Sequence, residues 1–230
     1  MTGVSFVRPL KHLVKKHPLA IRWFHWINFP LLALMIWSGT LIYWANAVYR
    51  VGFGKHTYWM MNLPPHAWDK LHVSYRLAEG MGYHFFLMWL FGINGVLYVA
   101  YTVFSGEWRE LVPNRRSFVA AIQVTLHDLH LRREAPPQGK YNGAQQIAYS
   151  SIVLMGLGSL LTGIAIYKPT QFHLLTSMFG GYPMARFFHF WLTVGYVAFF
   201  VIHIAQVIRT GWNNFRAMVI GSEVVELPNE

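Results

Sequence analysis

The stretch FFHFWLTVGYVAFFVIHIAQVI, residues 187–208, contains no Asp, Glu, Lys or Arg. Three other windows are equally free of these residues: 23–49, 80–106 and 141–167. A helix needs about 20 apolar residues to cross the roughly 30 Å hydrocarbon core of a bilayer, and all four windows are long enough. We therefore predict an all-α integral membrane protein, a four-transmembrane-helix bundle in one membrane domain (1–230), with spans at about 20–46, 81–105, 146–167 and 187–208.

The composition agrees with a membrane protein. Of the 230 residues, 54% are hydrophobic and only 12% are charged, whereas a soluble domain carries about 25% charged residues. This charged fraction argues against an ordinary water-soluble protein and against disorder. Cysteine is absent, which excludes disulfides, thiolate metal sites, iron–sulfur clusters and haem attached covalently through Cys-x-x-Cys-His.

The basic residues predict the orientation of the chain in the membrane. The formal net charge is +10. Thirteen Lys and Arg residues flank the spans on the side of the two termini, against six on the opposite side. Basic residues concentrate in cytoplasmic loops, so both termini are predicted to be cytoplasmic. We read the basic excess as a topology signal and expect no nucleic-acid partner.

The segments between the spans carry weaker signals. Residues 114–131 have apolar side chains at helical spacing after a capping Asn114, which predicts a helix lying in the cytoplasmic interface. Residues 169–185 are uncharged but contain two prolines and two adjacent glycines, so we expect a loop there. The long segment 46–79 is expected outside the cytoplasm, as a lid on the helix ends or a docking surface. We see no second domain and no internal repeat.

Four of the twelve histidines lie within the predicted spans: His25, His84, His189 and His203. An ionisable side chain in a span is costly and is a functional hypothesis by default. His25 and His203 lie near the cytoplasmic ends of spans one and four, and His84 and His189 near the outer ends of spans two and four. His189 and His203 are 14 residues apart, so they share one helix face within about 40°, separated by roughly 21 Å.

Paired histidines at two depths favour one kind of cofactor. Any single histidine of this set has a simpler interpretation, an interhelical hydrogen bond. A zinc site normally has three or four ligands, often including carboxylate or thiolate, and the uncharged windows offer neither. Haem iron needs only two axial ligands, and the porphyrin fits between apolar helices. We therefore predict two haem b groups. Arg22 and Arg186, and also Lys168, lie at depths where they would meet haem propionates, although they would equally serve as membrane flanks.

Iron with two axial imidazoles has no open position, so such a haem passes single electrons. Two haems at opposite depths would carry electrons across the membrane between a mobile lipid-soluble carrier and a redox protein. Quinone is the expected carrier. We predict no catalytic residues on this chain and no substrate chemistry beyond oxidation or reduction of quinone.

The stretch HPLAIRWFHWINFPLLALMIWSGTLIY (17–43) resembles the first span of the four-helix di-haem cytochrome b family. That family includes bacterial cytochrome b561, the b-type subunit of nickel–iron hydrogenases and the gamma subunit of formate dehydrogenase. The stretches YHFFLMWLFGINGVLY (83–98), KYNGAQQIAY (140–149) and ARFFHFWLTVGYVAFFVIH (185–203) look most like its thiosulfate-reductase-type branch.

This resemblance implies that His84 with His189 binds the iron of an outer haem, and His25 with His203 that of a cytoplasmic haem. The same pairs follow from depth alone. The resemblance also implies a multi-pass protein of the bacterial inner membrane. As a member of that branch, the chain would connect the quinone pool to a periplasmic catalytic subunit of molybdopterin type.

Two alternatives remain open at the level of sequence. The first keeps the haems but changes the partner: the chain would be the b-type anchor of a hydrogenase or formate dehydrogenase, or a stand-alone quinone reductase. The second is of another class, a non-haem four-span transporter or receptor in which the histidines are structural.

Overall fold

Four long helices dominate the computed structural model, which describes residues 11–43, 45, 49–53, 56–60, 65–134 and 140–226. Each of the four is long and apolar enough to cross a membrane. This confirms the predicted fold class. The helices begin slightly before the predicted spans because polar residues near a span's end can reach the interface from within the helix. Their bounds are α1 Leu19–Tyr43, α3 Leu77–Ser105, α6 Gly143–Tyr167 and α8 Tyr182–Thr210.

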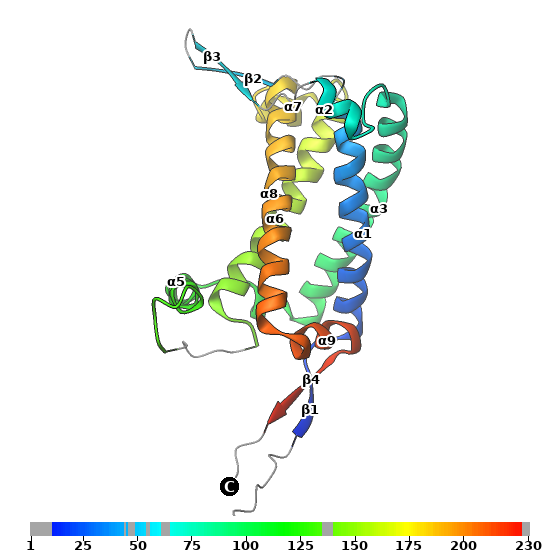
Figure 1. Ribbon diagram of the computed structural model, residues 1–230. Helices are drawn as coiled ribbons and strands as arrows, with labels where there is room; N and C mark the ends of the chain where they lie inside the picture. The colour runs from blue at the N-terminus through cyan, green and yellow to red at the C-terminus, as the bar shows by residue number, and fades with distance from the viewer. Residues whose placement is uncertain are drawn as a thin grey trace, which may run out of the picture. The chain divides into compact units, whose positions relative to one another are not determined.

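The chain divides into two compact units, of which the larger spans residues 27–197. In this unit the four long helices pack in a closed ring, and they run side by side in Figure 1. Gly80 of α3 lies against Leu41 of α1. The rings of Phe85 (α3) and Tyr167 (α6) are 4.8 Å apart between centroids. Other contacts join α6 to α8 through Gly158 and Leu192, and α8 to α1 through the stacked rings of Phe190 and Tyr43, 4.9 Å apart.

Short elements connect these helices. The predicted loop 169–185 is wrong in part, because it contains α7 (His173–Met178) and the start of α8. Thr176 of α7 donates to the carbonyl of Ala165 at 3.1 Å, which satisfies one of the last carbonyls of α6. Pro183 does not break α8, because proline is tolerated in the first turn of a helix.

The predicted lid 46–79 lies only partly within the described residues. Its described part contains an antiparallel strand pair, β2 (Tyr49–Phe53) and β3 (His56–Met60), in which Tyr49 pairs with Met60. The short helix α2 (Pro65–Lys70) follows. The role of this segment as a lid or docking surface remains a prediction.

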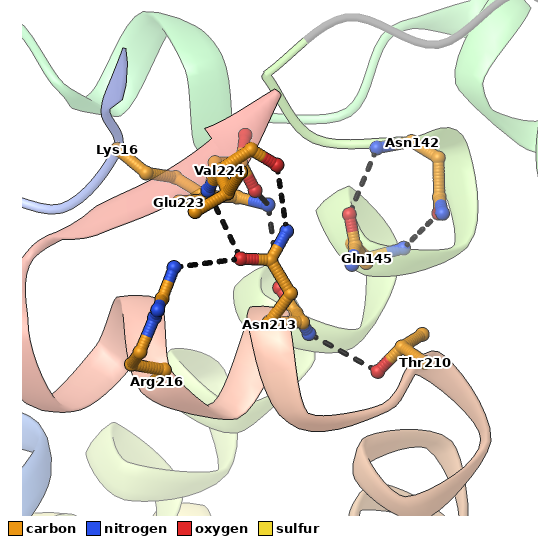
Figure 2. Close-up of polar contacts among 9 residues, drawn as sticks. Lys16, Asn142, Gln145, Thr210, Asn213, Arg216, Glu223 and Val224 are labelled. Carbon is orange, nitrogen blue, oxygen red and sulfur yellow. Dashed lines mark hydrogen bonds and ion pairs between the residues drawn. The ribbon is translucent and has the colours of Figure 1, made fainter. Parts of the chain in front are cut away.

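The predicted helix after Asn114 is present as α5 (Arg115–Asp128), preceded by the single turn α4 (Trp108–Leu111). Asn114 accepts hydrogen bonds from the backbone N–H groups of Arg116 and Ser117, at 2.8 and 3.2 Å, as predicted for a cap. A second capping box, formed by Asn142 and Gln145, starts α6 (Figure 2). The position of α5 in the membrane interface remains a prediction.

The smaller unit comprises residues 1–26 and 198–230. It contains β1 (Lys11–Lys15), α9 (Trp212–Ile220) and β4 (Ser222–Glu226) together with the ends of α1 and α8. The strands β1 and β4 pair antiparallel, with Lys15 opposite Ser222. Because these strands precede α1 and follow α8, the two ends of the chain lie on the same side of any bilayer that the four helices cross.

The packing of α1 against α3 depends on a glycine. A Cβ added at Gly80 would lie 2.6 Å from Leu41 Cβ and 3.2 Å from backbone atoms of Leu41 and Ile42, whereas at Gly82 it would meet nothing within 4 Å. We expect Gly80→Ala to lower the free energy of unfolding by about 1–3 kcal/mol through overpacking. Gly82→Ala, two residues away on the same helix, should be neutral or slightly stabilising. Thermal unfolding of both variants in detergent tests this, and equal midpoints would contradict it.

Candidate functional site

The larger unit brings His84 of α3 and His189 of α8 together. Their ring centroids are 6.2 Å apart and the ring planes lie at 75°. Each histidine is in the second turn of its helix. At this separation the two rings form no direct hydrogen bond with each other.

A hydroxyl group from a neighbouring helix contacts each of these imidazoles. Ser38 Oγ of α1 lies 3.0 Å from His84 Nδ1 and donates its proton to the carbonyl of Met35 at 3.1 Å. Thr162 Oγ1 of α6 lies 2.9 Å from His189 Nδ1 and donates to the carbonyl of Gly158 at 2.7 Å. Ser38 and Thr162 are buried, with 0% and 1% of their surface exposed.

These contacts favour the Nδ1–H tautomer of both rings. A hydroxyl has one proton, and each of these hydroxyls is placed to use it on a backbone carbonyl. In that tautomer the hydroxyl oxygen accepts a hydrogen bond from Nδ1–H, and a backbone carbonyl, of Met35 for His84 and of Ser159 for His189, also bonds the ring. In a neutral imidazole that leaves the lone pair of Nε2 available to a metal. A histidine that binds a metal through one ring nitrogen usually donates the N–H of its other ring nitrogen to an acceptor of this kind.

The glycines after these hydroxyl residues leave space for the imidazoles. A Cβ added at Gly39 would lie 3.6 Å from His84 Cε1, and one added at Gly163 would lie 3.4 Å from His189 Cε1. Larger side chains at either position would meet the ring. Gly163 belongs to the small residues of the third span that are typical of close helix packing.

The smaller unit contains the second pair, His25 of α1 and His203 of α8. Their ring centroids are also 6.2 Å apart, with the planes at 57°. Phe199 stacks on His203 with ring centroids 5.8 Å apart, and Trp26 meets His25 edge-on at 5.1 Å. Within the described residues, Nδ1 of His25 is buried and has no hydrogen-bond partner.

The β1–β4 ribbon and α9 fix the start of α1, where His25 lies. Trp26 Nε1 donates to the carbonyl of Met218 at 3.1 Å. Lys16 Nζ forms an ion pair with Glu223 at 2.7 Å and donates to Asn214 Oδ1 at 3.2 Å. Figure 2 shows Asn213 bonded to the backbone of Val224, which ties α9 to β4. The bonds of Trp26 and Lys16 join residues about 200 positions apart in the chain.

The two arginines predicted near the haem propionates lie close to the histidines along their helices. Arg22 precedes His25 by three residues, donates to the carbonyl of Val219, and has a buried Nε without a hydrogen-bond partner in the described residues. Arg186 precedes His189 by three residues, and its guanidinium carbon is 5.8 Å from the centre of the Tyr182 ring. The contact of either arginine with a propionate remains a prediction.

In both histidine pairs the ring centroids are 6.2 Å apart. With metal–imidazole bonds of about 2 Å, this separation would allow the two imidazoles of a pair to hold one metal ion between them. The described residues contain no group of three or more His, Cys, Asp or Glu side chains able to hold a metal ion. Two ligands suit haem iron, whose other four ligands come from the porphyrin.

Comparison with known proteins gives a family for this arrangement. Residues 16–221 match the family model described as prokaryotic cytochrome b561. This match covers most of the chain. The chain belongs to the prokaryotic cytochrome b561 family. It is also 28% identical over 198 residues to a protein of Azospira oryzae named "Putative protein-methionine-sulfoxide reductase subunit YedZ1", covering 86% of this chain and 92% of that relative.

Membership of the cytochrome b561 family confirms the family predicted from the sequence. It identifies the chain as a multi-pass, electron-transfer protein of a family that binds haem b.

Sequence reasoning did not identify Ser38 and Thr162. Serine and threonine are common in membrane helices, where they often bond to their own backbone. The available signal was their position, since each is followed by glycine five residues before the last tyrosine of its helix. Only the contact with a histidine on the neighbouring helix gives that position a meaning.

Proposed function

We propose that this cytochrome b561 family member is a di-haem membrane subunit that moves single electrons between the quinone pool and a redox partner outside the cytoplasm. The observation that supports this most directly is the pairing of four membrane histidines into two couples with equal ring separation, 6.2 Å. His84 and His189 would hold one haem, and His25 and His203 the other. Helix α8 supplies a ligand to each.

Haem with two imidazole ligands accepts and releases one electron at a time. The residues of this chain contribute binding, orientation and exclusion of water. Ser38 and Thr162 hold two of the four imidazoles, Phe199 and Trp26 pack against the other two. Arg22 is half-buried, and its buried Nε, which has no hydrogen-bond partner in the described residues, would be offered to a propionate. No residue of the chain is assigned to substrate chemistry.

The orientation and the partner complete the proposal. The excess of Lys and Arg on the side of the termini supports cytoplasmic ends in the bacterial inner membrane. The pairing of β1 with β4 supports an even number of crossings. The relative from Azospira oryzae is named as a reductase subunit, which supports a catalytic subunit as the partner of this chain. A molybdopterin enzyme in the periplasm is the partner type that the sequence resemblance favours.

A hydrogenase or formate dehydrogenase anchor would use the same two haems and differ only in the partner. No contact in the described residues favours these partners or a stand-alone quinone reductase. A non-haem transporter or receptor would leave the equal spacing of the two histidine pairs without a purpose, and the family match argues against it.

Single histidine substitutions test the pairing. We expect His84→Leu and His189→Leu to lose the same haem, and His25→Leu and His203→Leu to lose the other, because one axial ligand does not retain the group. The haem-to-protein ratio of each purified variant should fall from two to one, measured from the pyridine haemochrome spectrum. His127→Leu, on α5 and outside both pairs, is the control and should keep both haems.

The double variants sharpen this test. His84→Leu with His189→Leu should bind as much haem as either single variant, whereas His84→Leu with His203→Leu should bind none. A folded wild-type protein without a b-type band on reduction would overturn the di-haem proposal. Loss of the same haem from His84→Leu and His203→Leu would show that the pairs are assigned wrongly.

The exchange of electrons with quinol is tested on the native complex. We expect a water-soluble quinol to reduce the b-type haems of the complex, and a periplasmic oxidoreductase subunit to copurify with the tagged chain. Adding the oxidised substrate of that subunit should then reoxidise the haems. The variant lacking His25 and His203 should break this electron path. Haems that dithionite reduces but quinol does not would contradict the assignment of quinone as the carrier.

A further inference from the structure

The four long helices form two equivalent hairpins, α1–α3 and α6–α8. The first helix of each has 25 residues and the second has 29. Ser38 lies nineteen residues after the start of α1, and Thr162 lies nineteen after the start of α6. His84 and His189 each lie seven residues after the start of their helices. The helix lengths and the positions of these residues therefore repeat between the two hairpins, although the sequence alone did not reveal an internal repeat.

The equivalence extends to the residues around these positions. The dipeptide Ser38–Gly39 of the first hairpin corresponds to Thr162–Gly163 of the second. In each hairpin the hydroxyl on the first helix forms a hydrogen bond with the imidazole on the second helix. His-Phe-Phe-Leu at 84–87 corresponds to His-Phe-Trp-Leu at 189–192. Leu41 and Ala165 are equivalent and fully buried. Leu41 lies against Gly80, and the residue equivalent to Gly80 in the second hairpin is Ala185, which is also fully buried.

We infer that the equivalent dipeptides Ser38–Gly39 and Thr162–Gly163 position the imidazoles of His84 and His189, which would hold one haem. We further infer that they lower the midpoint potential of this haem. The inference rests on the proposed function. Each hydroxyl oxygen accepts Nδ1–H, which makes the imidazole a better electron donor to iron and stabilises the oxidised state. A methyl group at Gly39 or Gly163 would make ordinary van der Waals contact with the ring, at 3.6 and 3.4 Å from Cε1, so larger side chains there would meet the imidazole.

Within the described residues, no hydroxyl contact is found for His25 or His203, so we expect the effect at one haem and not at the other. The residue of α6 equivalent to His25 is Tyr149, and the residue of α3 equivalent to His203 is Tyr98. The two hairpins therefore differ at the positions of His25 and His203. Nδ1 of His25 has no hydrogen-bond partner in the described part of the chain. A substitution at Ser38 or Thr162 should accordingly change one haem and leave the other.

The test uses Ser38→Ala and Thr162→Val in the full-length haem-loaded protein. A redox titration followed at the b-type band should give two components in every protein. We expect each variant to raise the midpoint potential of one component, the same one in both, and to leave the other unchanged. The affinity of the variant for the affected haem, measured by transfer of that haem to apomyoglobin, should fall about 10- to 100-fold. This is the loss seen when the hydrogen-bond partner of a metal-binding histidine is removed.

Three further variants make the result specific. Thr162→Ser and Ser38→Thr keep the hydroxyl and should keep the wild-type potential. Thr102→Val is the matched control, because Thr102 is buried on α3 and donates to the carbonyl four residues before it, Tyr98, at 2.8 Å. Thr162 donates in the same way to the carbonyl four residues before it. For Thr102, however, no contact with a histidine is found within the described residues. It should leave both potentials unchanged.

The outcomes separate this inference from the proposed function. Wild-type protein without two b-type haems would overturn the proposed function. Two haems whose potentials and affinities are unchanged in Ser38→Ala and Thr162→Val would overturn the positioning role alone. An equal shift in Thr102→Val would also overturn it, since the effect would then follow from any lost hydroxyl. If Thr162→Val does not fold, the equivalence makes Ser38→Ala a sufficient test.

Discussion

An imidazole in a membrane has two nitrogens and little water to satisfy them. One carries a proton that needs an acceptor, and the other carries a lone pair that needs a donor or a metal. In the larger unit, a hydroxyl from the adjacent helix meets the first need for both His84 and His189. The lone pair of the second nitrogen is then available to a metal. Gly39 and Gly163 leave room for the two rings.

The bilayer explains why so much apolar surface lies on the outside of this protein. Many large hydrophobic side chains of the long helices are exposed, including Phe86, Trp89 and Val96 on α3. In lipid this exposure is favourable, and the buried positions go instead to small or hydroxyl-bearing residues such as Ser38, Thr162 and Ala185. Close approach between helices therefore replaces the hydrophobic core of a soluble bundle. The capping boxes at Asn114 and Asn142 lie in the segment between the second and third spans, at the starts of α5 and α6.

Much of this arrangement was accessible from the sequence. The uncharged windows predicted four long helices, Asn114 predicted the start of α5, and the depths of His25, His84, His189 and His203 predicted which rings would meet. The hydroxyl partners were not predicted, because a serine or threonine in a span has no meaning until its neighbour on another helix is known. The repeat was also hidden. Its two copies share helix lengths and a few positions, while residues equivalent to His25 and His203 are tyrosines.

The strands β1 and β4 were not predicted either, because each is short and mixed in polarity, and its partner lies more than 200 residues away. Their pairing makes the chain nearly a closed loop: the backbone leaves and returns at adjacent points, Lys15 and Ser222. A circular permutant that joins Lys11 to Glu226 with a short linker and opens in a loop elsewhere would preserve every described helix, because these two residues are paired in the ribbon.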